Sequence, residues 1–149
     1  MTRIARWPTI AFGLAVLAGC ATPASQMVKS STDAVSVNPD FRVDNELGEA
    51  GRELFVTKSC KGCHTVGVGR SSGPDLFGVV ERRPLDWLKS FLKNTDEMLD
   101  TDPIAQSLLE QHNNTRMPDL KLTDHEVDAL IHYMQLKTNE RRMKASAGS

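Results

Sequence analysis

The sequence predicts an all-α fold of about four helices. Apolar residues recur at helical spacing in several segments, and a capping box marks the start of the last one. No stretch shows the alternation of apolar and polar residues that is typical of a half-buried strand. The 149 residues, 40% hydrophobic and 25% charged, suit one globular domain. The net charge of -1 gives no indication of nucleic-acid binding.

Four segments carry the helical pattern. They are residues 45–55, the segment from about Pro84, residues 103–112 and the segment from Thr123. Pro84 suits the first turn of a helix, where its missing N–H has no partner to lose. Thr123 and Glu126 form the capping box, because each side chain can bond the other's backbone N–H. From Lys137 the chain is polar and basic, and we expect this end to fray.

The N-terminus has the pattern of an export signal. Arg3 and Arg6 precede an apolar run over residues 10–18. That run is too short to span a bilayer, which takes about 20 residues. It ends in Leu-Ala-Gly-Cys at positions 17–20, which resembles the lipobox of bacterial lipoproteins.

The lipobox resemblance implies cleavage before Cys20 and a diacylglycerol group on its thiol. We therefore predict a signal peptide over residues 1–19 and a lipid-anchored protein on the periplasmic side of a bacterial membrane, inner or outer. Two or more acyl chains give stable attachment, whereas one binds only marginally. The alternatives are a plain signal peptide and an uncleaved anchor, with Cys20 incidental.

The remaining chain divides into three parts. Residues 20–44 comprise the lipidated cysteine and a segment rich in Ser, Thr, Ala, Pro, Asn and Asp, which predicts a flexible tether. About 24 such residues have an r.m.s. reach of about 27 Å. Residues 45–136 form the predicted domain, and residues 137–149 form the polar tail.

Cys60, Cys63 and His64 form a CxxCH motif. Two thiols at this spacing can add across the two vinyl groups of a porphyrin, and the adjacent histidine then lies under the iron. A zinc site would need further ligands at the usual spacing, and a thioredoxin-like pair would lie in a βαβ pattern. Neither is present in the sequence, although a disulfide between the two cysteines remains an alternative. The motif predicts one covalent haem c.

The chain also resembles the class I cytochrome c family across residues 45–136. The resemblance rests on the order of AGRELF at 50–55, CKGCH at 60–64, GPDL at 73–76, RMP at 116–118, and Leu130 and Tyr133. It implies a cytochrome c-like bundle of about four helices around the haem. It also implies that Gly51 and Phe55 pack against Leu130 and Tyr133.

The resemblance further implies a set of haem contacts. Met117 is the expected distal iron ligand beside the proximal His64, with Met98 as the main rival and His112 as a lesser one. Pro74 is expected to hold its carbonyl near the ring N–H of His64 and so fix the orientation of the ligand. Trp87 and Arg70 are expected near the haem propionates, as a donor and a cation.

A haem with histidine and methionine ligands implies that the protein is an electron carrier and not an enzyme. Both axial positions of the iron are filled, and this ligand pair raises the reduction potential of the iron. The expected partners are redox proteins: a quinol-oxidising complex as donor, and a terminal oxidase or a denitrification reductase as acceptor.

Residues 52–93 carry a net charge of +4 and residues 94–128 a net charge of -7, a dipole suited to orienting such a complex. The alternatives are a haem enzyme or a gas or peroxide sensor with a displaceable distal ligand, and a non-haem lipoprotein.

Overall fold

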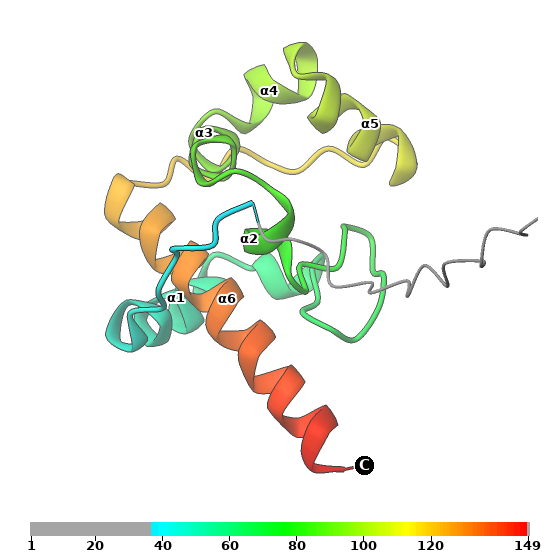
Figure 1. Ribbon diagram of the computed structural model, residues 1–149. Coiled ribbons are helices and arrows are strands. Elements are labelled where there is room, and N and C mark those ends of the chain that lie inside the picture. Colours follow the sequence, from blue (N-terminus) through cyan, green and yellow to red (C-terminus); the bar gives the residue numbers. More distant parts are fainter. Residues whose placement is uncertain (1–36, 149) are drawn as a thin grey trace, which may run out of the picture. The chain divides into compact units, whose positions relative to one another are not determined.

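The computed structural model describes residues 37–148 as an all-helical unit (Figure 1). Its helices are α1 (Asn45–Thr57), the 3-10 helix η1 (Cys60–Gly62), α2 (Val79–Arg82), α3 (Leu85–Lys93), α4 (Thr95–Thr101), α5 (Pro103–Gln111) and α6 (Asp124–Ala147). No strand occurs within the described range, so the predicted all-α fold is confirmed. Within that range, no helix combines the length and the apolar character that a membrane span requires. The predicted signal peptide, Cys20 and most of the predicted tether lie outside the described residues.

The crossing of α1 and α6 forms the base of the domain (Figure 1). Gly51 is buried there, and a Cβ atom built on it would lie only 2.0 Å from the carbonyl oxygen of Ala129. The rings of Phe55 and Tyr133 pack beside it, with centroids 5.1 Å apart. The absent side chain at Gly51 therefore allows the two helices to approach closely, as the family resemblance implies.

The start of α6 agrees with the sequence-based prediction, whereas its end does not. Its start is confirmed, because Thr123 and Glu126 form the reciprocal bonds of a capping box. The predicted fraying from Lys137 is wrong, since the helix continues to Ala147. Thr138 is fully buried and its Oγ1 accepts a 3.0 Å hydrogen bond from the N–H of Gly78. Contacts with distant residues thus hold the polar end of the helix.

The segment before α1 also packs on the domain, although it was expected to belong to the flexible tether. The side-chain amide of Asn38 donates to the carbonyl oxygens of Val80 and Arg83. The Phe41 ring lies 4.9 Å from the ring of His132. The ordered domain therefore includes residues 37–44.

Helices α2 and α4 were not predicted from the sequence. They have four and seven residues, too few for a periodic pattern to identify. Met98, the rival distal ligand, lies on α4.

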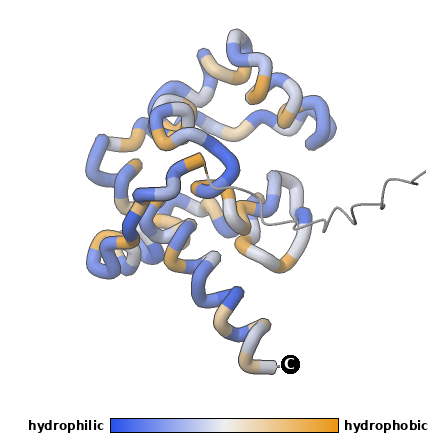
Figure 2. The backbone as a smooth tube through the Cα atoms, in the orientation of Figure 1, coloured by the Kyte–Doolittle hydropathy of each residue, from blue (hydrophilic) through white to orange (hydrophobic). Residues whose placement is uncertain are grey.

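The core lies where α1, α2 and α3 meet α6. Its buried members are Phe55, Val80, Leu88, Leu122, Val127, Leu130, Ile131, Tyr133 and Met134. The colours of Figure 2 show hydrophobic residues along these elements, with hydrophilic residues toward the far end of α6. The core has few aromatic residues, and most of the partly buried hydrophobic residues packed against it border the cavity described next.

Candidate functional site

A mainly apolar cavity opens between the CxxCH segment, α3, the loop after α5, and α6. Its volume is about 370 Å³, within the range of cofactor sites in proteins. Cys60, Cys63, His64, Pro74 and Met117 all lie on its wall. The structure thus brings together five of the residues that the sequence analysis singled out, from segments more than 50 positions apart.

The CxxCH segment is a tight turn directly after α1. The N–H of Cys63 and the N–H of His64 both donate to the carbonyl oxygen of Cys60, at 3.1 and 2.9 Å. Ser59 adopts a left-handed backbone conformation (φ 62°) that turns the chain out of the helix. Cys60 and Cys63 are free thiols, not a disulfide. The turn therefore presents two thiols and an imidazole to the same cavity.

His64 is held in one orientation. Its Nδ1 lies 2.9 Å from the carbonyl oxygen of Pro74. A carbonyl oxygen only accepts, so Nδ1 carries the hydrogen and Nε2 keeps a free lone pair. Burial lowers the pKa of His64, which favours the neutral imidazole that binds metals. A Cβ atom on Gly73 would lie 2.6 Å from Cε1 of His64, so only glycine leaves room for the ring.

The two methionine candidates occupy different places. Met117 lines the cavity from the loop between α5 and α6, whereas Met98 is half-buried on α4 and does not line it. Arg116 lies 2.8 Å from the carboxylate of Asp100, which ties the Met117 loop to α4. The geometry therefore favours Met117 over Met98 as a residue facing a cofactor.

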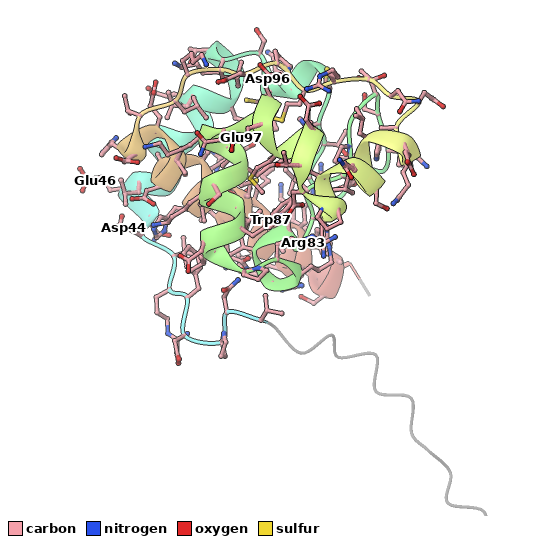
Figure 3. All side chains as sticks on the ribbon, turned by 90° about the horizontal axis from the view of Figure 1, so that it is seen from above. Asp44, Glu46, Arg83, Trp87, Asp96 and Glu97 are labelled. Atoms are coloured by element: carbon pink, nitrogen blue, oxygen red, sulfur yellow. The ribbon has the colours of Figure 1, made fainter. Side chains whose placement is uncertain are left out.

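Trp87 lies on the cavity wall, whereas Arg70 lies away from it. Trp87 lines the cavity and stacks on Phe91, and its Nε1 is buried with no hydrogen-bond partner among residues 37–148. Arg70 is exposed, donates to the carbonyl oxygen of Gln111 and does not line the cavity. Arg83, in contrast, lines the cavity, with its guanidinium 5.8 Å from the centre of the Trp87 ring. Figure 3 shows Arg83 and Trp87 side by side near the start of α3.

The remaining histidines lie apart from this arrangement or at its edge. His112 is buried on the cavity wall, with Nδ1 3.2 Å from the carbonyl oxygen of Ser72. His132 accepts a 2.9 Å hydrogen bond from the N–H of Asp44, outside the cavity. In the part of the chain that the structure covers, no three His, Cys, Asp or Glu side chains cluster to hold a metal ion.

A family model described as cytochrome c matches residues 48–137, well over half of the chain. The chain belongs to the cytochrome c family. The CxxCH turn, the cavity and the helical fold all lie within the matched range or directly beside it.

Solved structures agree with this assignment. A cytochrome c from Rhodothermus marinus is 26% identical and aligns with a TM-score of 0.61, over 66% of this chain and 83% of that one. The cytochrome c domain of the pp3183 protein from Pseudomonas putida is 40% identical with a TM-score of 0.56, over 64% of this chain and 94% of that one.

Among curated proteins, cytochrome c oxidase subunit 2 of Alkalihalophilus pseudofirmus is 34% identical over 93 residues. The match spans 60% of this chain but only 25% of the oxidase subunit. The similarity is therefore to one part of that larger protein.

The family implies a covalently bound haem c, and the residues around the cavity of this cytochrome c fit one. The wall is apolar, as the porphyrin faces require. The unpaired Nε1–H of Trp87 and the guanidinium of Arg83 suit the carboxylates at the edge of a haem. Arg83 was missed in the sequence analysis, because it lies in the extended turn between α2 and α3 and no helical spacing links it to Trp87.

The loop that carries Pro74 is fixed by Asp75. Its carboxylate accepts hydrogen bonds from the backbone N–H groups of Gly67, Val68, Gly69 and Phe77, at 2.7–3.1 Å. Although burial opposes the charged form, these donors lower the pKa of Asp75 to about 2. The carboxylate therefore stabilises the loop at every pH above its unfolded value, and this stabilisation is lost as the pH falls toward 2.

We expect Asp75→Asn to lower the free energy of unfolding at neutral pH by about 1–2 kcal/mol, allowing for solvent screening. The amide keeps one acceptor oxygen but loses the charge. Urea unfolding of both proteins at neutral pH and at a pH close to 2 measures the difference. The two stabilities should converge in acid, and a constant gap at both pH values would show that the charge of Asp75 is not responsible.

Proposed function

We propose that this cytochrome c carries single electrons between redox proteins, with haem c bound through Cys60 and Cys63 and iron held by His64 and Met117. One observation carries the proposal: a fixed imidazole with a free Nε2 and a thioether line the same apolar cavity. When bound, the haem iron accepts and releases one electron, and a histidine–methionine ligand pair raises its potential.

The chain's own residues have distinct tasks in this scheme. Pro74 orients His64 through its carbonyl group, and a bond of this kind raises the basicity of the ligand. Arg83 and Trp87 bind the haem carboxylates, which removes an unpaired buried donor from the wall. The apolar residues of the wall, such as Leu88 and Leu130, exclude water from the iron. An apolar environment also raises the reduction potential, because it favours the less charged ferrous haem.

The cofactor is tested by extraction and by spectroscopy. Acid–acetone treatment should leave the haem on the polypeptide, because thioether bonds to Cys60 and Cys63 do not release it. The reduced absorption spectrum of the denatured protein should then be that of one haem c per chain. Haem that extracts into the solvent would contradict covalent attachment, and a protein without haem would favour the non-haem alternative.

Similarity to an oxidase subunit supports a place next to a terminal oxidase. We propose a quinol-oxidising complex as donor, and a terminal oxidase or a denitrification reductase as acceptor. The charged groups at the cavity suit docking of such partners, since Lys58, Arg82 and Arg83 line it while acidic residues such as Asp96 and Glu97 lie on α4 (Figure 3).

We further propose that the domain is tethered through a lipid on Cys20 to the periplasmic side of a bacterial membrane. Cys20→Ser is expected to release the haem domain from the membrane fraction, because the acyl chains supply the membrane affinity. Fractionation followed by haem staining measures this. Intact-mass analysis of the native protein that finds an unmodified Cys20 would rule out the lipid anchor.

A further inference from the structure

A second hollow lies between the far part of α6 and the loop around Gly67. It is lined by Gly67, Phe77, Arg141, Arg142, Lys144 and Ala145. The α6 residues of this basic cleft lie beyond the range 48–137 that matches the family model. The cleft is therefore built by an extension of α6 that the haem site does not require, which projects from the domain in Figure 1.

The basic cleft contains positive groups that have no anionic partner among residues 37–148. Nε of Arg141 is buried and has no hydrogen-bond partner in the described part of the chain. Lys144 forms no ion pair within residues 37–148. Arg142, in contrast, pairs with Glu81 at 2.5 Å and lies over the ring of Phe77. Two cationic side chains therefore remain to receive an anion.

The acidic groups around the cleft are already engaged. Glu81 also accepts from Gln135, and Asp75 accepts from four backbone N–H groups. Glu140, on the same helix, pairs with Lys137 and Arg52. None of them is available to Arg141 or Lys144, and an external anion with several acceptor oxygens, such as a phosphate group, suits the site.

We propose that the basic cleft binds the phosphate groups of anionic lipids and so holds the tethered domain against the membrane surface. This inference rests on the lipid tether proposed above. The N–H of Val37, the first described residue, donates at 2.9 Å to the carbonyl oxygen of Glu81, the residue that pairs with Arg142. The tether thus joins the domain beside the cleft. Val37 stands only 17 positions after Cys20, the proposed lipidation site, so anchoring at Cys20 keeps the cleft near the headgroups.

The test uses the full lipidated, haem-loaded chain in two kinds of nanodisc, one of phosphatidylcholine and one of phosphatidylcholine mixed with phosphatidylglycerol. Hydrogen exchange of residues 138–147 is the readout. We expect exchange to be at least about fivefold slower in the anionic discs, because one basic residue near an anionic surface contributes about that factor. Arg141→Gln with Lys144→Gln should abolish the difference. Lys89→Gln with Lys93→Gln, an equal charge change on α3, should preserve it.

Equal exchange in both kinds of disc would overturn the inference, as would loss of the difference in the α3 control. Inorganic phosphate that gives the same protection without discs would also overturn it, because the cleft would then bind a free anion. Failure of the tether is seen separately, since an unlipidated chain would not remain on the neutral discs.

Discussion

Gly51→Ala is expected to destabilise the domain by about 3 kcal/mol, the upper end of the usual cost of overpacking, because the clash is with backbone. The added Cβ would lie 2.0 Å from the carbonyl oxygen of Ala129, and a backbone atom cannot move aside as a side-chain end can. The gain in helix propensity on replacing glycine is only about 1 kcal/mol, so the clash dominates. Denaturant unfolding of the haem-loaded protein measures the change.

Gly48→Ala on the same helix is the matched control. Its Cβ would meet Cδ2 of Leu136 at 2.8 Å, and that flexible side-chain end can rotate away. We expect its stability to remain within about 1 kcal/mol of the wild type. If Gly51→Ala proved as mild as Gly48→Ala, the account of the α1–α6 crossing would be wrong.

Met117→Ala is expected to change the iron site more than any other single substitution outside the CxxCH motif. Loss of the thioether should open a coordination position and abolish the weak far-red absorption band that sulfur ligation gives ferric haem. The potential should fall by on the order of 100 mV, because an electron-poor thioether favours the reduced iron. Absorption spectroscopy and a redox titration measure both effects.

Met98→Ala provides the comparison for the distal ligand. Met98 lies on α4 away from the cavity wall, so its truncation should lower stability by about 1–3 kcal/mol and leave the band intact. If Met98→Ala abolished the band and Met117→Ala preserved it, the ligand would be Met98. The fold and the attachment of the haem would be unaffected by that result.

The limits of prediction from sequence are clear in α6. The capping box could be predicted from the sequence because Thr123 and Glu126 interact within one turn. The end of the helix was not, because Thr138 and Arg142 are held by Gly78 and Glu81, about 60 positions earlier. A polar, basic pattern alone does not reveal such distant partners. The packing of Asn38 against Val80 and Arg83 was missed for the same reason.

The candidate site shows a similar division. Cys60, Cys63 and His64 follow from local spacing, whereas Pro74 follows from the family resemblance. The structure places all four on one cavity. Their roles as ligands and attachment points remain predictions. The choice between Arg70 and Arg83 depends on the path of the loop after the CxxCH motif, which turns Arg70 toward the end of α5. Composition and spacing do not determine that path.

We propose that residues of this chain fill both axial positions of the iron, so that the protein transfers electrons and binds no substrate at iron. Far-red absorption of the ferric wild-type protein, combined with rapid mixing of the ferrous protein with carbon monoxide, tests it most directly. We expect the sulfur–iron band and no rapid binding of carbon monoxide. Absence of the band together with fast carbon monoxide binding would contradict it and would favour a haem enzyme or a gas sensor.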